Sequence, residues 1–266
     1  MAAITDFDEY VAALKGPREL QQFTKLALSA TAGRNYSPWV TGTLNGSAPT
    51  TAAVPTNTTT GALGQENAGT ETLYMVGGRA TTSFPGHFTL YDRLAHQGGL
   101  SGTVTTAQAT NLPTATITRG SAVGVWAALQ IYTQIGTTAT TVSVSYTNSA
   151  GTAGRTSPLV VFGATGNREA GRVILLPVVA GDNGVQSVES VTVTATTGTA
   201  GAFGVTLIRP LLTVCVDTLV GNSAFDFVSG GACGGIPEIP DGACLDWIYM
   251  TQGTTAFIGA LRFMAV

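Results

Sequence analysis

Charged side chains are scarce in this chain. Its 266 residues include 12 Lys and Arg and 15 Asp and Glu, so only 10% are charged, whereas about 25% is usual in soluble domains. The net charge is −3 and the few cations form no run, so binding to a phosphate backbone is not expected. Two interpretations of the uncharged surface remain open: hydroxyl groups wet a Thr-rich β surface, or neighbouring subunits cover it. Weak repulsion between copies favours the second.

Long apolar runs and targeting signals are also missing. No stretch of 18 apolar residues occurs, so neither a transmembrane helix nor a membrane partner is expected. The first ten residues carry Asp6, Asp8 and Glu9 and have no basic start followed by an apolar core. A secretory signal peptide is therefore not expected, and we expect synthesis in the cytoplasm.

Residues that commonly bind metals are few. His87 and His96 lie nine residues apart, form no His-Glu-x-x-His pattern, and have no Cys or carboxylate at a zinc-like spacing. The three cysteines are an odd number without a Cys-x-x-Cys pair, and we expect them to be reduced: Cys215, Cys233 and Cys244. We therefore predict no metal and no cofactor.

Several segments match part of a known catalytic motif, and none of them matches the whole motif. Gly99–Thr103 approaches a nucleophile elbow, but a threonine stands where the second glycine belongs. Gly163–Arg168 lacks the Lys-Ser/Thr of a phosphate loop, so we interpret it as a loop between strands. Ser101, His96 and Asp92 leave a Ser-His-Asp assembly open, although serine is too common here to indicate one. No pair of carboxylates is spaced for glycoside hydrolysis, and we predict no catalytic residue and no enzymatic activity.

The stretch from Thr137 to Leu212 has the periodicity of β-strands. In Thr141–Tyr146, valine and tyrosine alternate with threonine and serine, as in a strand with one solvated face. Apolar runs follow at Leu159–Phe162 and Arg172–Val179, separated by Gly, Asn and Asp turn residues. This pattern predicts a mainly β protein with an antiparallel β-sandwich or jelly-roll-like fold.

Two other regions predict strands. Gly120–Ile135 reads as one long strand with apolar residues on both faces, which indicates that both faces are partly covered. Leu245–Met250 and Ala256–Met264 read as two apolar strands, and Thr251–Thr254 supplies a turn that would join them in a hairpin.

The N-terminal region has helical spacing. Ile4, Phe7, Val11 and Leu14 predict a first helix, and a second is predicted over Arg18–Ser29. Two roles stay open for these helices. They either cap the sandwich or form an arm that docks on a neighbouring subunit or shell.

The composition divides the chain into three parts. These are a helical N-terminal arm over 1–33, an extended Thr/Pro/Gly-rich segment over 34–70, and a β-sandwich domain over 71–266. The extended segment is long enough to need a function or a partner. Our candidate interface residues are Phe7, Val11, Leu20, Phe23 and, as an anchor, Trp39.

Several segments in the middle half of the chain have distinctive residue sequences: Tyr91–His96, Gly98–Thr103, Ser145–Asn148, Gly166–Gly171 and Gly198–Val205. In their residue sequences and in their order along the chain, these segments resemble virion structural proteins of tailed bacteriophages. The resemblance implies a β-rich accessory protein of the head or tail, located in the virion and made in the host cytoplasm.

Together with the low charge, the resemblance predicts a capsid decoration (cement) protein that stabilises the head. The expected partners are the phage major capsid protein and copies of this chain, for instance in a trimer, which would bury apolar and hydroxyl-lined surface. Three alternatives remain: a tail or neck protein, the major shell subunit, or a carbohydrate-binding β-sandwich. The last needs an exposed aromatic platform, for which Trp126 and Tyr132 are the candidates.

Overall fold

The structure of the chain is a computed structural model. It describes residues 7–8, 11, 19–26, 30–41, 45–110, 112, 117–216, 222–226, 236–254 and 256–266. Within this part the chain forms sixteen strands in three sheets, and every strand pairing is antiparallel. The predicted mainly antiparallel β-sandwich class is therefore confirmed. No helix among the described residues is long and apolar enough to cross a membrane.

Sheet B runs through the middle of the molecule with the strand order β10-β6-β12-β4-β15-β2. Its two long strands are β12 (Ala202–Val216) and β4 (Gly86–Leu100), each of 15 residues, which pair along nearly their whole length. The remaining strands are β10 (Val173–Leu176), β6 (Trp126–Thr133), β15 (Leu245–Thr251) and β2 (Asn35–Tyr36).

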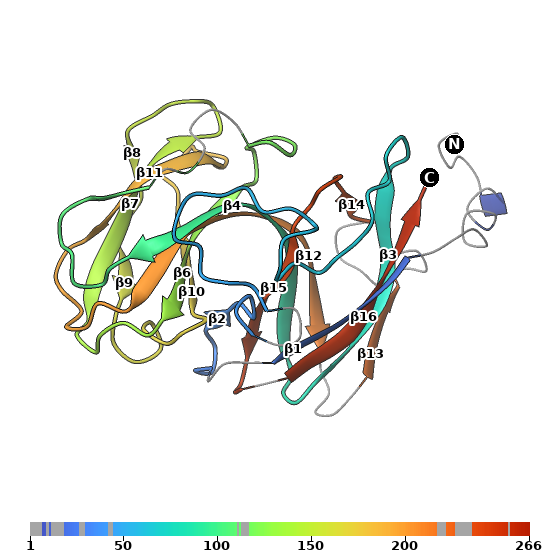
Figure 1. Cartoon of the computed structure of the whole chain (residues 1–266), viewed down its shortest axis with the longest axis horizontal. Helices are drawn as coiled ribbons and strands as arrows, with labels where there is room; N and C mark the ends of the chain where they lie inside the picture. Colours follow the sequence, from blue (N-terminus) through green and yellow to red (C-terminus); the bar gives the residue numbers. More distant parts are fainter. Residues whose placement is uncertain are drawn as a thin grey trace.

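Two further sheets pack on sheet B, one in each lobe of the molecule (Figure 1). Sheet A consists of β1 (Glu19–Leu26), β16 (Ala256–Ala265), β3 (Leu73–Thr82) and β13 (Asn222–Asp226), with β14 (Glu238–Ile239) paired to β3. Sheet C consists of β5 (Gln108–Ala109), β11 (Val185–Val193), β7 (Thr140–Asn148) and β8 (Arg155–Thr156), with β9 (Val160–Phe162) paired to β7.

The two ends of the long strands belong to different cores. Phe203 of β12 joins Val144 of β7 in the cluster between sheets B and C. Phe88 of β4 and Val214 of β12 join Phe263 of β16 in the cluster between sheets B and A. The chain therefore builds two β-sandwiches that share β4 and β12, and these strands cross from one lobe to the other in Figure 1.

Sheet B also curls until its outer strands meet. Tyr36 of β2 forms an isolated bridge with Arg172, the residue before β10. The backbone N–H of Ser37 donates to the carbonyl of Gly171 at 2.9 Å. A third apolar cluster consists only of sheet B residues that contact one another inside the curl: Tyr91, Ala128, Val173, Ile208 and Ile248. We call this space the curl interior.

Local patterns explain the central strands well. Along β7 the side chains alternate between buried and half-buried, and Val142, Val144 and Tyr146 are buried as predicted. Strand β6 is shorter than the predicted 120–135, but six consecutive residues within it are buried. Sheet C covers one face of β6 and the curl interior takes the other, so both faces are covered, as predicted.

The helix predicted over residues 18–29 is wrong, because residues 19–26 form β1. This strand pairs with β16 from Glu19↔Phe263 to Leu26↔Ala256. Phe23 and Lys25, two residues apart, are both buried. The apolar positions of this segment thus fit a strand period of two as well as a helical period. Pairing with β16 favours the strand. In the predicted first helix, Phe7, Asp8 and Val11 have helical backbone, and its other residues lie outside the described part.

The predicted C-terminal hairpin is also wrong, although both of its strands exist. Strand β15 pairs with β4 and β2 in sheet B, whereas β16 pairs with β3 and β1 in sheet A. The chain after Thr251 therefore crosses from one sheet to the other. The aromatic residues of the two strands meet across the core, with the ring centroids of Trp247 and Phe257 5.1 Å apart. Burial of these rings in an edge-to-face contact, with an interplanar angle of 84°, outweighed the local turn signal.

The extended segment over 34–70 lies against its own chain. Ala53 bridges to His96, and Leu63 bridges to Leu245. Trp39 is buried, and its indole N–H donates to the carbonyl of Ser47 at 3.0 Å. Since β1 and β2 both belong to the sandwiches, residues that precede 71 complete the folded unit.

Replacing Phe23 tests whether β1 belongs to the core. Its side chain is 3% exposed, and its ring centroid lies 4.9 Å from that of Phe257 and 6.0 Å from that of Trp247. We expect Phe23→Ala to lower the free energy of unfolding by about 3–5 kcal/mol, because it leaves a cavity. Phe7→Ala, at a side chain 74% exposed, should change it by less than about 0.5 kcal/mol. Urea denaturation measures both, and equal small effects would contradict the position of β1.

Candidate functional site

The structure distributes the five candidate interface residues over different environments. Phe7 is exposed and Val11 is half-buried, while the side chain of Leu20 lies outside the described part. Phe23 lies in the core between sheets A and B, and Trp39 lies in a small cluster with Ala62, Tyr132 and Cys244. Phe23 and Trp39 therefore pack inside their own chain and offer no surface to a partner. Phe7 is the exposed candidate among those described.

Among the described residues, Arg93 makes the largest number of side-chain polar contacts, and it is fully buried at one end of the curl interior. Its guanidinium donates to Gln130 Oε1 at 2.7 Å, to the Tyr91 hydroxyl at 3.0 Å and to Thr206 Oγ1 at 3.2 Å. Its Cζ lies 4.1 Å from the centroid of the Trp39 ring, which is a cation–π contact. Strands β4, β6 and β12 and the segment before β3 therefore meet at one side chain.

Two buried carboxylates balance the charge here. Asp246 lies 3.4 Å from Arg93 Nη2 and accepts hydrogen bonds from the Tyr91 hydroxyl at 2.7 Å and from Ser37 Oγ at 3.0 Å. Asp92 accepts a bidentate pair from Arg119 at 3.0 and 2.8 Å. Because a buried charge left without a partner costs several kcal/mol, these contacts constrain how the strands are arranged.

Burial shifts the pKa values of the bases around this cluster. Desolvation, followed by the neighbouring Arg93 charge, lowers the pKa of His96 to about 3, so the imidazole is neutral at pH 7. Desolvation also lowers the pKa of Lys25, while the nearby Asp246 acts in the opposite sense. Lys25 Nζ donates to the carbonyl of Gly61 at 2.9 Å. The cluster thus places solvent-excluded cations beside buried carboxylates, and these pairs fix the relative positions of the strands that carry them.

These contacts differ from those of a catalytic triad. The Asp92 carboxylate is held by Arg119, and His96 Nδ1 lies 3.5 Å from Arg93 Nη1. The Ser101 hydroxyl is 2.9 Å from that of Thr103. A nucleophile requires a base within hydrogen-bond distance, which itself must be oriented by a third group. The contacts of Ser101, His96 and Asp92 do not connect the three residues in that way.

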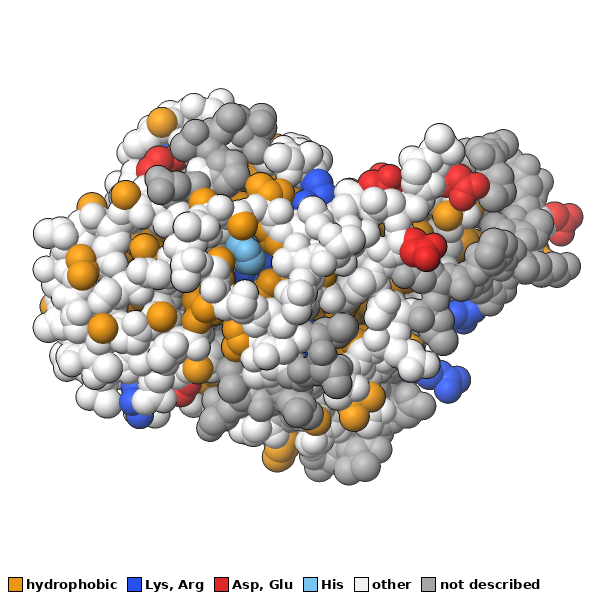
Figure 2. Space-filling model, in the orientation of Figure 1, with side chains coloured by type: hydrophobic (Ala, Val, Ile, Leu, Met, Phe, Trp, Pro, Cys, Tyr) orange, Lys and Arg blue, Asp and Glu red, His pale blue; other side chains and the backbone are white. Residues whose placement is uncertain are grey.

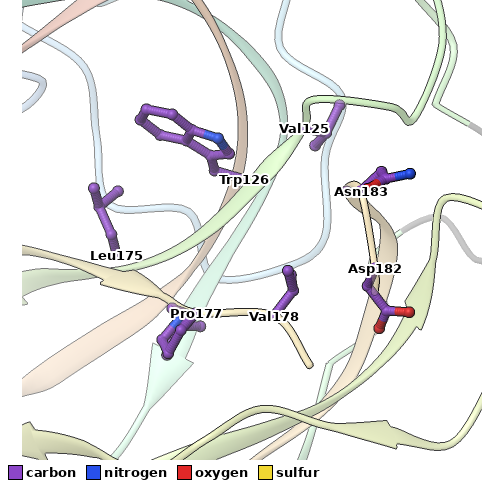
Figure 3. Close-up of a pocket in the computed structure, with 9 residues that line it drawn as sticks. Val125, Trp126, Leu175, Pro177, Val178, Asp182 and Asn183 are labelled. Carbon is purple, nitrogen blue, oxygen red and sulfur yellow. The ribbon is translucent and has the colours of Figure 1, made fainter. Parts of the chain in front are cut away.

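A pocket with a mainly apolar lining lies at the mouth of the curl interior. It has a volume of about 440 Å³ and is lined by the start of β6, the end of β10 and the turn before β11: Val125, Trp126, Leu175, Leu176, Pro177, Val178, Asp182, Asn183 and Gly184. Trp126 is 43% exposed, and Val123 beside it is also exposed. In Figure 3 the Trp126 and Leu175 side chains lie on one side of the pocket, and Asn183 and Asp182 lie on the other. We call this the Trp126 pocket.

The acidic side of the Trp126 pocket is already satisfied by its own chain. The Asp182 carboxylate accepts hydrogen bonds from Tyr146, from Asn148 at 2.7 Å and from Arg155 at 3.1 Å. These bonds, that from Tyr146 first, lower the pKa of Asp182. Asp182 therefore fixes the turn after β10, and the apolar side chains remain as the unpartnered part of the pocket.

The face of the molecule drawn in Figure 2 is weakly charged. Figure 2 shows uncharged side chains and backbone over most of the visible described surface, with a few scattered charges. Trp126 was singled out from the sequence as half of an aromatic platform. Its proposed partner Tyr132 is buried in the cluster that contains Trp39, so this pair forms no exposed platform. The other walls come from residues about 50 positions later in the chain, and no sequence signal joined them to Trp126.

No protein-family model and no curated protein matches the chain. Among solved structures it is similar to that of infectious bursal disease virus Gt strain, with 10% identity and a TM-score of 0.18 over 94% of this chain and 81% of the other. It is also similar to infectious bursal virus derived T=1 particles, with 9% identity and a TM-score of 0.20 over 94% and 78%. A VP2 subviral particle of infectious bursal disease virus gives 8% and 0.19 over 94% and 81%. TM-scores of this size carry no argument about fold or function.

The low pKa of His96 predicts a specific loss of stability in acid. The pKa is lowered from 6.5 to about 3 on folding, so between these values the unfolded chain binds a proton that the folded chain does not. Stability therefore falls as pH falls from about 6.5 towards about 3. At pH 4.5 the His96 contribution is a loss of about 2–3 kcal/mol relative to pH 7.

Urea unfolding at pH 7 and pH 4.5 measures this loss. His96→Gln removes the titrating group, and its stability difference between the two pH values should be smaller than that of the natural chain by that amount. His87→Gln, at an exposed position, is the matched control and should keep the natural difference. An unchanged difference in His96→Gln would show that His96 titrates alike in both states.

Proposed function

We propose that the chain is a non-enzymatic structural protein of a tailed-bacteriophage particle, and specifically a decoration (cement) protein of the head. It would be made in the host cytoplasm and bind across neighbouring subunits of the major capsid protein. Two features of the sequence support the proposal. Segments such as Tyr91–His96 and Gly198–Val205 resemble virion structural proteins, and only 10% of residues are charged.

The observation that carries the proposal is the exposed Trp126 pocket on a weakly charged surface. Tryptophan is among the residues that most often dominate the energy of protein interfaces, especially where it can enter or line a pocket. The pocket has an apolar wall formed by Leu175, Pro177 and Val178 and a volume of about 440 Å³. Those dimensions fit an apolar side chain or a short loop of a neighbouring subunit.

The mechanism would be burial of apolar surface. Because Trp126 is 43% exposed, covering it would remove about 65–110 Å² of the about 150–250 Å² that a tryptophan can bury. At about 25 cal/mol per Å² this corresponds to about 1.5–3 kcal/mol before the costs of association. The scarcity of charge limits the desolvation penalty over the rest of the contact. Because the protein would bind the assembled shell and not free subunits, it would stabilise the shell by mass action.

A carbohydrate-binding role is the second candidate. The observation that favours it is the exposed Trp126 indole opposite the exposed amide of Asn183, since sugars stack on aromatic rings and hydrogen-bond to amides. The loss of Tyr132 from the platform weighs against this role, because one ring remains where two were expected.

Replacing Trp126 tests the proposed contact. We expect Trp126→Ala to weaken binding to emptied phage heads by about 30-fold, which corresponds to the loss of an interface hot spot of about 2 kcal/mol. Val161→Ala is the matched control, because Val161 is apolar and 56% exposed but lies outside the pocket. Co-sedimentation of the full chain with heads, together with its own sedimentation mass, measures binding and oligomeric state.

Other outcomes distinguish the remaining roles. Closed particles formed by the chain alone would identify a shell subunit. A monomer that does not bind to heads would favour a tail or neck protein or a glycan-binding protein, and a glycan array tests the last of these. Deletion of residues 1–16 leaves β1 complete. If this deletion abolishes head binding while Trp126→Ala does not, the contact lies in the N-terminal segment and not at the Trp126 pocket.

A further inference from the structure

A row of three sulfur- and nitrogen-bearing side chains crosses the half of sheet B that lies beyond the curl interior. Cys215 of β12 pairs with His87 of β4, and His87 pairs with Met250 of β15. Residues paired directly across antiparallel strands project from the same face, with their Cβ atoms about 4.5–5.5 Å apart. The strand register therefore aligns a thiol, an imidazole and a thioether on one surface.

Side-chain geometry brings the first two groups into contact. Cys215 Sγ lies 3.2 Å from His87 Nδ1, and both residues are exposed. In metal sites with sulfur at about 2.3 Å and nitrogen at about 2.0 Å, a tetrahedral angle separates the two ligand atoms by about 3.5 Å. The observed separation is close to that value. A metal ion could thus be shared by the two groups after a small side-chain adjustment.

The row opens into a hollow of about 300 Å³ that Cys215, His87 and Met250 line together. The remaining lining residues include glycine, proline, threonine and glutamine, and no carboxylate is among them. Gly86 allows the close approach of β4 and β15 here, because a Cβ at this position would lie 2.4 Å from the Met250 carbonyl oxygen. The hollow therefore presents soft donor atoms without hard oxygen anions.

We propose that Cys215, His87 and Met250 form a binding site for a soft monovalent metal ion, Cu(I). Thiolate and thioether sulfur select Cu(I) over the hard divalent cations, and imidazole nitrogen is compatible with it. The Cys215 thiol loses its proton on binding, His87 coordinates through neutral Nδ1, and Met250 coordinates through Sδ. Among described residues no three His, Cys, Asp or Glu side chains gather at one point, and a thioether completes the set here. This site is independent of the proposed virion role.

Titration of the reduced full-length chain with Cu(I) without oxygen, against a coloured Cu(I) chelator, tests the site. We expect one Cu(I) per chain and an ultraviolet thiolate-to-copper charge-transfer band. Cys215→Ser should abolish the band, and His87→Asn and Met250→Leu should each weaken binding by about tenfold or more. Cys244→Ser, at a buried thiol that does not line the hollow, is the control and should leave the band and the affinity unchanged.

Alkylation gives a second measurement that does not depend on affinity. Iodoacetamide should label Cys215 in the metal-free chain, and one equivalent of Cu(I) should protect it, as mapped by mass spectrometry. Circular dichroism checks that each variant is folded; Met250→Leu conserves side-chain volume and is the variant that isolates the thioether. Normal Cu(I) binding by Cys215→Ser, unchanged binding by Met250→Leu, or Zn²⁺ binding as tight as that of Cu(I) would each overturn the proposal.

Discussion

The buried guanidinium of Arg93 constrains how four separate parts of this fold pack together. It lies where β4, β6, β12 and the N-terminal extended segment converge, and its donors reach Gln130, Tyr91 and Thr206 while Trp39 covers its face. An ion pair of this kind adds little net stability over an apolar substitute, but it penalises arrangements that leave the charge unpaired. A shift of β15 by one residue would move Asp246 to the opposite face of the sheet and away from Arg93.

The parts of the fold that could be predicted are those decided within a single strand. Val142, Val144 and Tyr146 alternate with small polar residues, and that period survives in β7 because sheet C has one covered face. Residues 19–26 illustrate the opposite case, since Phe23 fits both a helical and a strand period. Only the pairing with β16, more than 200 residues later, decides between them. The prediction of a C-terminal hairpin was wrong for the same reason, because the turn residues carry no information on which sheet each strand joins.

The candidate sites were harder to predict from the sequence than the fold was. Trp126 could be named because it is an aromatic residue on one face of a predicted strand, but the other walls of its pocket come from β10 and the following turn. Tyr132 has the same sequence character as an exposed aromatic, yet the extended segment around Trp39 covers it. Cys215 and His87 are 128 positions apart. Motif reasoning searches for ligands at short spacing, whereas an antiparallel sheet brings residues together by register.

The sharing of β4 and β12 between the two lobes has a mechanical consequence. Each strand has 15 residues and so extends over about 50 Å, and the two are bonded to each other nearly throughout. No flexible linker separates the lobes along these strands, so the lobes cannot rotate about a hinge there without breaking sheet hydrogen bonds. A force that pulls the lobes apart along the strand direction would be carried by the covalent backbones of both strands, which pass without a break from one lobe to the other. The two lobes therefore form one rigid unit, and the distance between them is fixed by the length of β4 and β12.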